Sequence, residues 1–444
     1  MEPVPATVPP VPAPPADGSG NPAGPPQPLV RGDFRRLLIA VGALSLGLEL
    51  QATIVALQIY YLVTDPGWRP LALGMVGLAG AVPFLITALP AGHVADLVSR
   101  RLVMVCSTVA LGGCSLALLL LSWRTPDALT VWLIFAVLAV SGMARAFVNP
   151  ARSALVVELV PRDRLAAASA LRSLFWQIGA IAGPAVGGLL YWLGVRFTAH
   201  GDALGGPRFA YVGDCLIMAV AVGQSVAIRH RAGAPARPPG ESRSGEFLAG
   251  LRFAWSQPLL LWPMSLDLFA VFFGGAMALL PYFSDAMGAG SGGMGLMRAA
   301  PTAGAVAMSL ILRKRRDLLL NHAGARLLWA VAGFGWCMIG FGLSRWLVVS
   351  VLLLAVSGAL DFISVVIRTT MVQRMTPAHL QGRVSAVSSI FVFASNDLGD
   401  AESGLTARLL GPVRAVVAGG CMTLVVVATV AWRAPELRRM QRLD

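Results

Sequence analysis

Charged residues are scarce in this chain of 444 residues. Asp, Glu, Lys and Arg make up only 13% of it, 56% is hydrophobic, and the mean hydropathy is +0.71. A soluble protein of this length contains about a quarter charged residues. Apolar runs of roughly 18 residues or more, the length that crosses a bilayer, recur along the whole chain. The sequence therefore predicts an integral membrane protein whose surroundings are the lipid bilayer.

Patterns that mark enzymes and metal centres are also missing. The chain has no HExxH sequence, nucleophile elbow or phosphate-binding loop, and its five histidines are scattered. All five cysteines lie inside apolar runs without a CxxC pair, which is typical of small buried hydrophobic residues. We expect no enzyme, no metal site and no cofactor. Without a Walker sequence, ATP is not expected to drive the protein directly.

Twelve apolar segments are long enough to span a membrane, six on each side of a polar linker. They cover approximately residues 35–61, 71–95, 102–123, 129–149, 167–194 and 209–229, and then 258–283, 291–312, 325–344, 346–367, 384–410 and 413–432. This pattern predicts an all-α membrane protein with two six-helix bundles, at 31–229 and 258–433.

The remaining segments are polar. Residues 1–30 are rich in proline and contain no Lys or Arg, so they predict a disordered tail and no signal peptide. Docking through its proline motifs is the alternative role for that tail. The linker 230–257 ends in an amphipathic segment in which Phe247, Leu251 and Trp255 recur every four residues, a spacing that favours an interfacial helix. Residues 434–444 form a second short tail.

Basic residues are distributed unevenly among the connections. We number each connection by the span that it follows. Of the 35 Lys and Arg residues, 26 fall in the tails and even-numbered connections and eight in the odd-numbered ones, while Arg145 lies inside a span. Positive charge is retained on the cytoplasmic side of a membrane, so both termini are predicted to be cytoplasmic. The net charge of +13 is thus a topology signal, and nucleic acid is not an expected partner.

The two halves carry an internal repeat. A shift of 216 residues superposes identical residues in two spans and the loop between them. The matches are Ser141-Gly142 with Ser357-Gly358, Arg152 with Arg368, Pro161 with Pro377, Ser169-Ala170 with Ser385-Ala386, Ser173 with Ser389, and Gly183 with Gly399. Two six-helix halves in parallel orientation are the repeat pattern of secondary transporters, whose substrate site lies near the midplane between the repeats.

Two motifs resemble those of a known family. Gly92, Asp96, Arg100 and Arg101 form G-x-x-x-D-x-x-x-R-R between spans 2 and 3, which resembles the cytoplasmic loop motif of the major facilitator superfamily. A glycine-proline pattern in span 5 resembles the motif of that superfamily's proton antiporters, which are exporters, although Ala170 replaces its usual first glycine. The pattern consists of Gly179, Gly183, Pro184, Gly187 and Gly188.

The resemblance extends over about residues 31–433. Residues 152–171 and 396–404 are similar to the bacterial branch that contains enterobactin exporters, also described as transmembrane secretion effectors. In the superfamily, the motif aspartate is held by the motif arginine and the start of helix 11 when the cytoplasmic side is closed. The resemblance therefore implies that Asp96 is part of a conformational latch. Ordinary loop charges that obey the positive-inside rule are the alternative.

Ionisable groups inside spans are costly and indicate function. The resemblance implies that spans 1, 4, 7 and 10 line a central cavity. The residues that we single out as a candidate proton or substrate site are Glu49, Gln51, Arg145, Asp267, Asp361, Asn396, Asp397, Asp400 and Glu402. A carboxylate in an apolar cavity suits a proton carrier, while one satisfied by neighbouring amides and hydroxyls would be structural. Asp214 in span 6 is expected to be structural.

Depth distinguishes some of these groups. Glu49 is expected roughly 20 Å from the cytoplasmic start of span 1, and Arg145 about 9 Å from the cytoplasmic end of span 4, so the two are not expected to touch. The 216-residue shift superposes Arg145 on Asp361. We expect these two to form an ion pair only when the cytoplasmic side closes. The alternative is local satisfaction, with Asp361 reaching Arg368.

Together these features predict a proton-coupled exporter of a small organic molecule, such as a siderophore or a hydrophobic drug. We expect it to act as a monomer in the bacterial inner membrane, with protons as its coupling ion. An importer or uniporter of the same fold is the alternative, and a membrane sensor without transport activity is a more distant one.

Overall fold

All regular structure among the described residues is helical. The computed structural model describes residues 32–198, 205–229, 252, 255, 257–314, 322–377 and 381–439. The first half of the chain contains α1 (Gly32–Leu62), α2 (Arg69–Leu97), α3 (Arg100–Leu121), α4 (Ala128–Leu159), η1 (Arg162–Arg164), α5 (Leu165–Phe197) and α6 (Gly205–Ala227). The second half contains α8 (Pro258–Gly274), η2 (Met277–Leu279), α9 (Leu280–Ala286), α10 (Gly290–Lys314), α12 (Ala323–Leu343), α13 (Leu347–Met375), α14 (Gln381–Leu410), α15 (Pro412–Arg433) and α16 (Pro435–Arg439).

The twelve expected spans are present as helices. Within the described residues, 11 segments are long and apolar enough to cross a membrane, one of them formed by α8, η2 and α9 together. The twelfth is α14, a helix of 30 residues that contains Asp397, Asp400 and Glu402 and packs along α2 and α8. The predicted fold class, twelve helices in two bundles, is therefore confirmed. Residues 1–30 and 440–444 and most of the linker, including Phe247 and Leu251, lie outside the described residues, whereas the expected tail 434–444 begins with the short helix α16.

Several helices continue beyond the apolar segments that predicted them. α4 extends from its expected end at 149 to Leu159, with Pro150 inside it, and α13 extends from 367 to Met375. A helix does not stop where its apolar run stops, because its backbone hydrogen bonds are internal and tolerate polar side chains. Arg152 and Arg368, expected in loops, are consequently helical.

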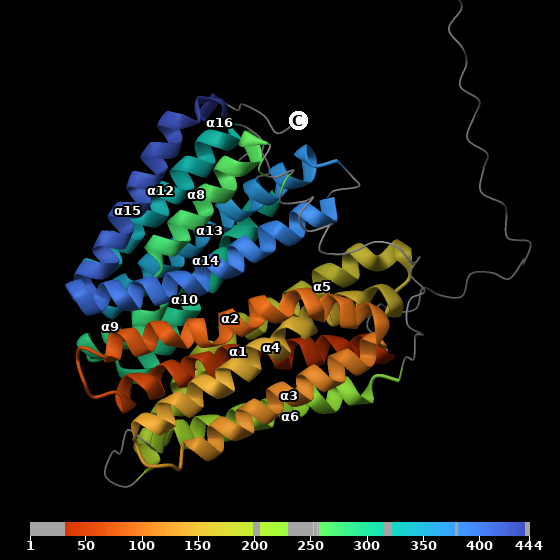
Figure 1. Ribbon diagram of the computed structural model, residues 1–444, viewed down its shortest axis with the longest axis vertical. Coiled ribbons are helices and arrows are strands. Elements are labelled where there is room, and N and C mark those ends of the chain that lie inside the picture. Colours follow the sequence, from red (N-terminus) through yellow and green to blue (C-terminus); the bar gives the residue numbers. More distant parts are fainter. Residues whose placement is uncertain are drawn as a thin grey trace, which may run out of the picture.

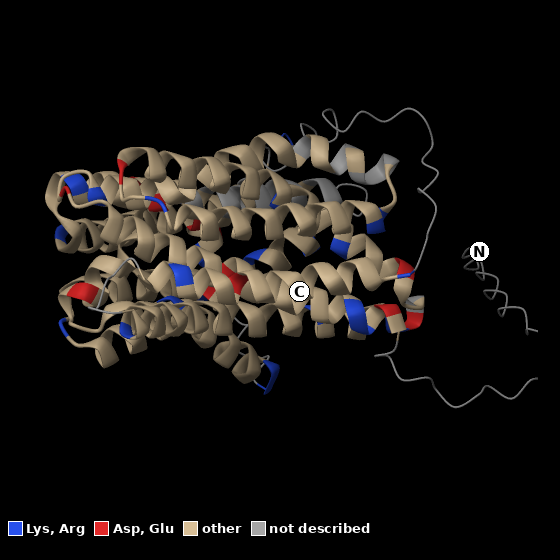
Figure 2. Cartoon of the chain, turned by 90° about the horizontal axis from the view of Figure 1, so that it is seen from below, with Lys and Arg blue, Asp and Glu red and all other residues tan. Residues whose placement is uncertain are grey.

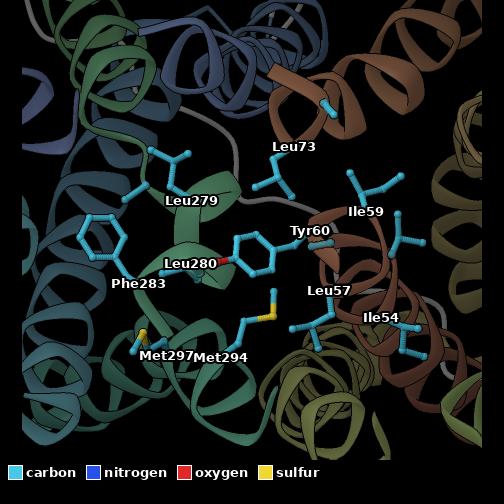
Figure 3. Close-up of a cluster of buried hydrophobic side chains, with 14 of the residues drawn as sticks. Ile54, Leu57, Ile59, Tyr60, Leu73, Leu279, Leu280, Phe283, Met294 and Met297 are labelled. Carbon is cyan, nitrogen blue, oxygen red and sulfur yellow. The ribbon is translucent and has the colours of Figure 1, made fainter. Parts of the chain in front are cut away.

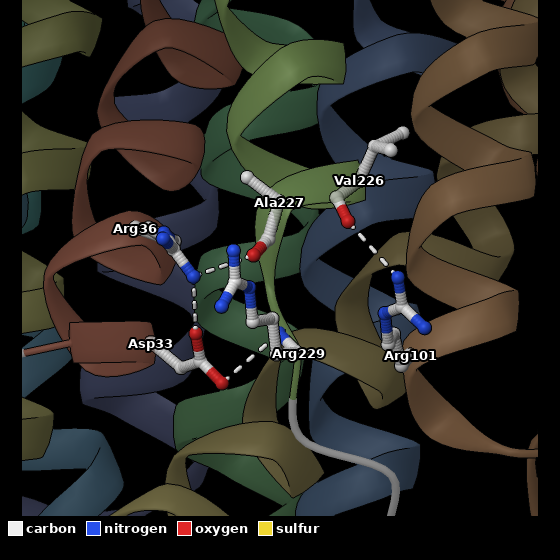
Figure 4. Close-up of polar contacts among 6 residues, drawn as sticks. All are labelled: Asp33, Arg36, Arg101, Val226, Ala227 and Arg229. Atoms are coloured by element: carbon white, nitrogen blue, oxygen red, sulfur yellow. Dashed lines mark hydrogen bonds and ion pairs between the residues drawn. The ribbon is translucent and has the colours of Figure 1, made fainter.

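The start of α1 meets the end of α6 at one end of the molecule. Arg36 Nη1 donates to the carbonyl oxygen of Ala227 at 2.6 Å, and the backbone N–H of Arg229 donates to Asp33 Oδ2 at 3.0 Å (Figure 4). The start of α8 and the end of α15 lie at the same end (Figure 1). We call this end the terminal end and the opposite one the far end.

The repeat in sequence corresponds to equivalent helix contacts. A Cβ atom at Gly142 of α4 would overlap the carbonyl oxygen of Gly80 in α2, and one at Gly358 of α13 would overlap that of Pro301 in α10. These two glycines are 216 positions apart, and both let a backbone approach its neighbour directly. Small residues have this role in membrane helices because lipid offers no hydrophobic drive for helix association.

The two halves meet at the far end. One apolar cluster combines Ile54 and Leu57 of α1 with Leu280 and Phe283 of α9 (Figure 3). Beside it, Tyr60 donates a hydrogen bond to Asp285 Oδ2 at 3.0 Å across the halves. Two further clusters are each confined to one half, and Figure 1 shows the halves diverging toward the terminal end. The structure is thus closed at its far end.

Glycine contacts bring the halves together at this closure. A Cβ at Gly188 of α5 would lie 2.5 Å from the Ser291 carbonyl oxygen of α10, and one at Gly404 of α14 would lie 2.6 Å from that of Pro70 in α2. Such distances exclude any larger residue without separation of the helices. The far-end closure therefore consists of backbone-to-backbone contacts between α5 and α10 and between α2 and α14.

We predict that Gly142→Ala and Gly358→Ala each destabilise the protein by about 1–3 kcal/mol, because the added methyl group pushes apart two helices that have no flexible side chain between them. The measurement is thermal unfolding of the purified protein in detergent. Gly113→Ala is the matched control, since a Cβ at Gly113 of α3 meets nothing within 4 Å. Equal melting temperatures for all three variants would contradict this account.

Candidate functional site

A cavity of about 370 Å³ lies between the halves, next to the far-end closure. It is bordered by α1, α2, α4, η2, α10 and α14, and four charged side chains reach it from four different helices. They are Glu49 of α1, Arg145 of α4, Arg298 of α10 and Asp400 of α14. Figure 2 shows that many of the charged residues gather toward the two ends of the bundle. The interior charges therefore mark this cavity as the candidate site.

Glu49 and Arg298 join the two halves electrostatically. Glu49 Oε2 lies 4.0 Å from Arg298 Nη2, and the two side chains are 37% and 21% exposed. Arg298 was not expected here, because we counted it among the eight basic residues of the odd-numbered connections. The structure places it inside α10, about 12 Å from the helix start at Gly290. Its position within the expected span 291–312 was the signal that could have identified it.

Arg145 lies farther from the end of its helix than expected. Because α4 continues to Leu159, Arg145 is about 21 Å from the terminal end of its helix instead of about 9 Å. It lines the same cavity as Glu49 and is exposed to it. Over the part of the chain that the structure describes, Arg145 forms no ion pair. Its expected pair with Asp361 of α13 belongs to a state closed at the terminal end and stays a prediction.

Asp267 is not a cavity residue. It lies on α8 and forms an ion pair with Arg368 Nη1 of α13, and both side chains are buried, at 7% and 4% exposure. This corrects the expectation that Asp267 faces the cavity, and it gives Arg368 a partner other than Asp361, which was the alternative considered for it. Asp267 lies on α8, the first part of span 7, and its side chain is buried inside the C-terminal bundle. A carboxylate buried there needs a cation as its partner.

α14 supplies polar groups to a break in span 7. The helix is interrupted between α8 and η2, at Gly275 and Ala276. Asp400 Oδ1 accepts a hydrogen bond from the backbone N–H of Ala278 at 3.2 Å, and Ser403 donates one to the carbonyl oxygen of Gly275 at 2.6 Å. Backbone groups released by a helix break must find partners inside a membrane. Asp400 therefore both borders the cavity and stabilises the break.

The other candidates on α14 are separated by helix geometry. Asn396 lines the cavity one turn from Asp400. Glu402 accepts a hydrogen bond from its own-helix neighbour Thr406 at 2.6 Å and is not among the residues lining the cavity. The side chain of Asp397 lies outside the described part of the structure. Asp400 and Glu402 thus do not share the cavity.

The glycine-proline motif of α5 packs against α1 directly behind Glu49. A Cβ at Gly183 would lie 2.7 Å from the Glu49 Cβ, and one at Gly179 would lie 2.8 Å from the Gly42 carbonyl oxygen. Gly187 continues this contact toward Leu50. The next residues face the other half, since both Gly188 and the Pro184 carbonyl oxygen approach Gly295 of α10. The motif therefore positions Glu49 and closes the far end at once.

The two arginines of the loop motif bind within their own half. Arg100 Nη1 lies 2.6 Å from Glu158 Oε1 of α4, and Arg101 Nη2 donates to the carbonyl oxygen of Val226 at 2.9 Å (Figure 4). Gly92 and Asp96 lie on the last turns of α2, and their surroundings are outside the described structure. The latch between Asp96 and the start of α14 remains a prediction.

Polar groups behind α1 form a separate, buried set. The Gln51 amide lines the cavity and donates to Ser115 Oγ of α3 at 3.1 Å. The Asp214 carboxylate of α6 is fully buried next to these two side chains. This arrangement places Asp214 inside the N-terminal bundle and away from the cavity, which agrees with its expected structural position.

We predict that Asp267→Asn destabilises the protein by about 3–5 kcal/mol, because Arg368 would be left as a buried, unpaired cation. The double variant Asp267→Leu with Arg368→Met should recover most of this loss, since it removes both charges. Thermal unfolding in detergent measures both effects. Asp163→Asn is the control: Asp163 forms an exposed pair with Arg164, and such pairs contribute about 0–1 kcal/mol. A double variant as unstable as the single one would contradict this explanation.

Comparisons with known proteins agree with this architecture. The solved D-xylose–proton symporter superposes with a TM-score of 0.68 at 12% identity, covering 91% of this chain and 98% of that one. An inward-facing bacterial homologue of the human lysosomal transporter Spinster superposes with a TM-score of 0.66 at 14% identity and the same coverages. At these identities the likeness establishes the fold alone.

Relatives in sequence indicate the family more specifically than the solved structures do. The chain is 29% identical over 425 residues to the multidrug efflux pump Tap of Mycolicibacterium fortuitum, covering 91% of this chain and 96% of Tap. It is 27% identical over 429 residues to the enterobactin exporter EntS of Escherichia coli (strain SE11), covering 92% and 93%. The family model for transmembrane secretion effectors matches residues 23–444. The chain is therefore a multi-pass membrane transporter, not an enzyme, and it belongs to the transmembrane secretion effector family of the major facilitator superfamily.

Proposed function

We propose that this protein exports small organic molecules from bacteria by alternating access, driven by protons that move in the opposite direction. The observation that carries the proposal is the ion pair between Glu49 and Arg298, because it combines a titratable carboxylate, the central cavity and the contact between the halves. Support for export comes from the relatives, a multidrug efflux pump and an enterobactin exporter. The span 5 motif, which resembles that of proton antiporters, supports the same direction.

The orientation follows from the distribution of arginine. Most basic residues fall in the connections and tails at the terminal end, so we place this end in the cytoplasm. The structure is then an inward-facing state, closed toward the outside by the glycine contacts and the apolar cluster at the far end. Export would begin when cargo enters the cavity from the cytoplasmic side.

The attraction between Glu49 and Arg298 is strong enough to favour the state with a closed far end over the state with an open one, but not to prevent the change between them. Two unit charges 4 Å apart attract by about 1 kcal/mol in water and about 4 kcal/mol at the protein surface. Glu49 is 37% exposed, so the lower value applies. An energy of about 1 kcal/mol changes the ratio of the two states about fivefold. A proton on Glu49 removes the attraction, and this links protonation to opening of the far end.

Asp400 is the second candidate for the proton. It borders the same cavity and accepts a hydrogen bond from Ala278 at the break in span 7, so a change in its charge would be felt by that backbone. The alternative for both carboxylates is a structural one, in which they stay ionised throughout transport. The two experiments below distinguish these possibilities and also test for a uniporter.

We predict that everted membrane vesicles with an acidic interior accumulate enterobactin when they contain the protein, because inward proton flow in cells corresponds to outward flow from such vesicles. An uncoupler should release the accumulated compound within the time that the proton gradient needs to collapse. Vesicles without the protein serve as the control. Transport that continues unchanged after the uncoupler is added would identify a uniporter instead.

We predict that Glu49→Gln lowers proton-driven accumulation at least tenfold while exchange of labelled for unlabelled cargo stays measurable. The amide keeps the shape of the side chain but cannot take up a proton. Glu436→Gln, on the exposed α16, is the matched control and should transport normally. If Glu49→Gln accumulates cargo like the unaltered protein, the proton-carrying role passes to Asp400, and Asp400→Asn becomes the decisive variant.

A further inference from the structure

We propose that the cavity is built for an amphipathic organic anion, whose anionic group is bound by Arg298 and whose binding is assisted by Arg145. This inference rests on the proposed function in one respect, namely that the cavity between the halves is the transport pathway. It adds the charge of the cargo and a binding role for Arg298. Both guanidinium groups border the same cavity, one from each half of the molecule.

Arg145 is an exposed cation inside a membrane-spanning helix. It reaches the cavity from α4 and, over the described ranges, has no carboxylate as an ion-pair partner. A charged side chain within the bilayer is costly, and such residues usually pair with another charge or serve a ligand. The buried pair of Arg368 and Asp267 shows how this chain compensates an interior arginine whose position is purely structural. Arg145 lacks such compensation.

Arg298 is only partly satisfied. Its Nε is buried without a hydrogen-bond acceptor, and its Nη2 is 4.0 Å from Glu49, which is beyond hydrogen-bond distance. A guanidinium carries five N–H donors in a planar fork that matches a carboxylate or another planar oxyanion. An anionic oxygen placed against Arg298 would therefore make hydrogen bonds that the Glu49 carboxylate does not make in this state.

The carboxylates of the cavity are less available to a ligand. Asp400 already accepts a hydrogen bond from the Ala278 backbone, and its removal from this contact would leave the break in span 7 unsatisfied. Glu49 faces Arg298, so a cationic ligand at Glu49 would lie close to a fixed positive charge. With Asp400 engaged at the break, the two guanidinium groups of Arg145 and Arg298 face the single carboxylate of Glu49, and this excess of positive charge favours an anion over a cation.

Apolar side chains complete the lining and define the rest of the ligand. They come from α1, α2, α4 and η2, and they include Leu48, Val55, Leu73, Val76, Leu138 and Met277. A volume of about 370 Å³ is within the usual range for small-molecule sites and accommodates a compact body of one or two rings. The cavity therefore matches a molecule with one anionic end and an apolar body.

Binding of such an anion has a consequence for the closed far end. The anion and Glu49 would compete for the same guanidinium, so cargo would weaken the attraction between α1 and α10. An empty transporter retains this attraction, whereas a loaded one loses it. The same competition makes a specific prediction: removal of the Glu49 charge should strengthen anion binding even though it is expected to impair proton-driven transport.

The test is equilibrium binding to the purified full-length protein in lipid nanodiscs, without any proton gradient. The probes are 2-naphthoate and 2-naphthylmethylammonium, which share an apolar body and carry opposite charges. We expect calorimetry to detect saturable binding of the naphthoate and at least tenfold weaker binding of the ammonium. Arg298→Gln and Arg145→Gln should each weaken naphthoate binding about tenfold or more. Arg414→Gln, at the exposed start of α15, is the matched control and should bind normally.

Glu49→Gln distinguishes the loss of a binding group from poor folding, because this variant should bind 2-naphthoate several times more tightly than the unaltered protein. Misfolding cannot produce such a gain. Tighter binding of the ammonium probe, no saturable binding of the naphthoate, or naphthoate binding that neither arginine substitution weakens would each overturn the proposal. This assay uses no proton gradient. Anion binding can therefore fail while proton-driven accumulation in vesicles succeeds, and anion binding can succeed while proton-driven accumulation fails, so the two proposals are tested separately.

Discussion

Direct contact between helix backbones is the constraint on which this structure depends. Lipid is as apolar as leucine, so helices in a membrane gain little from covering apolar side chains and associate instead through close packing. Here that packing is made at glycine, within each half at Gly142 and Gly358 and between the halves at Gly188 and Gly404. The same contacts decide where the halves touch and where they separate. The cavity lies next to the far end, where Gly188 and Gly404 make the contacts between the halves.

Interior charges in this protein serve two different purposes, and their surroundings distinguish them. Asp267 and Arg368 are buried, belong to one bundle and neutralise each other, so they tie α8 to α13. Glu49 and Arg298 are partly exposed, belong to different bundles and lie at a distance that permits attraction without a hydrogen bond. A pair of the first kind stabilises one arrangement of helices. A pair of the second kind is weak enough to be exchanged for a proton or a ligand.

Span 7 connects these two kinds of interaction. Its first part, α8, is tied into the C-terminal bundle by Asp267, while its last part, α9, contacts α1 of the other half through Asp285 and Tyr60. Between them the helix is broken, and Asp400 and Ser403 of α14 bind the backbone groups that the break releases. The span thus consists of two helical pieces with different partners, and a cavity carboxylate is hydrogen-bonded to the segment that separates them.

The sequence by itself determined the membrane class, the twelve spans and the repeat of two halves, because apolar length and the recurrence of small residues are local properties of the chain. It also identified Glu49, Arg145 and Asp400 as interior charges worth testing. Only the tertiary structure decided which of these share a cavity, that Arg298 joins them, and that Asp267 is bound to Arg368 instead. The physical reason is that the partner of a charge depends on the rotation and depth of its helix relative to its neighbours. A change of one residue in a helix turns its side chain by about 100°, and several extra turns, as in α4, increase the distance of a group from the end of its helix by more than 10 Å. Apolar length records neither of these.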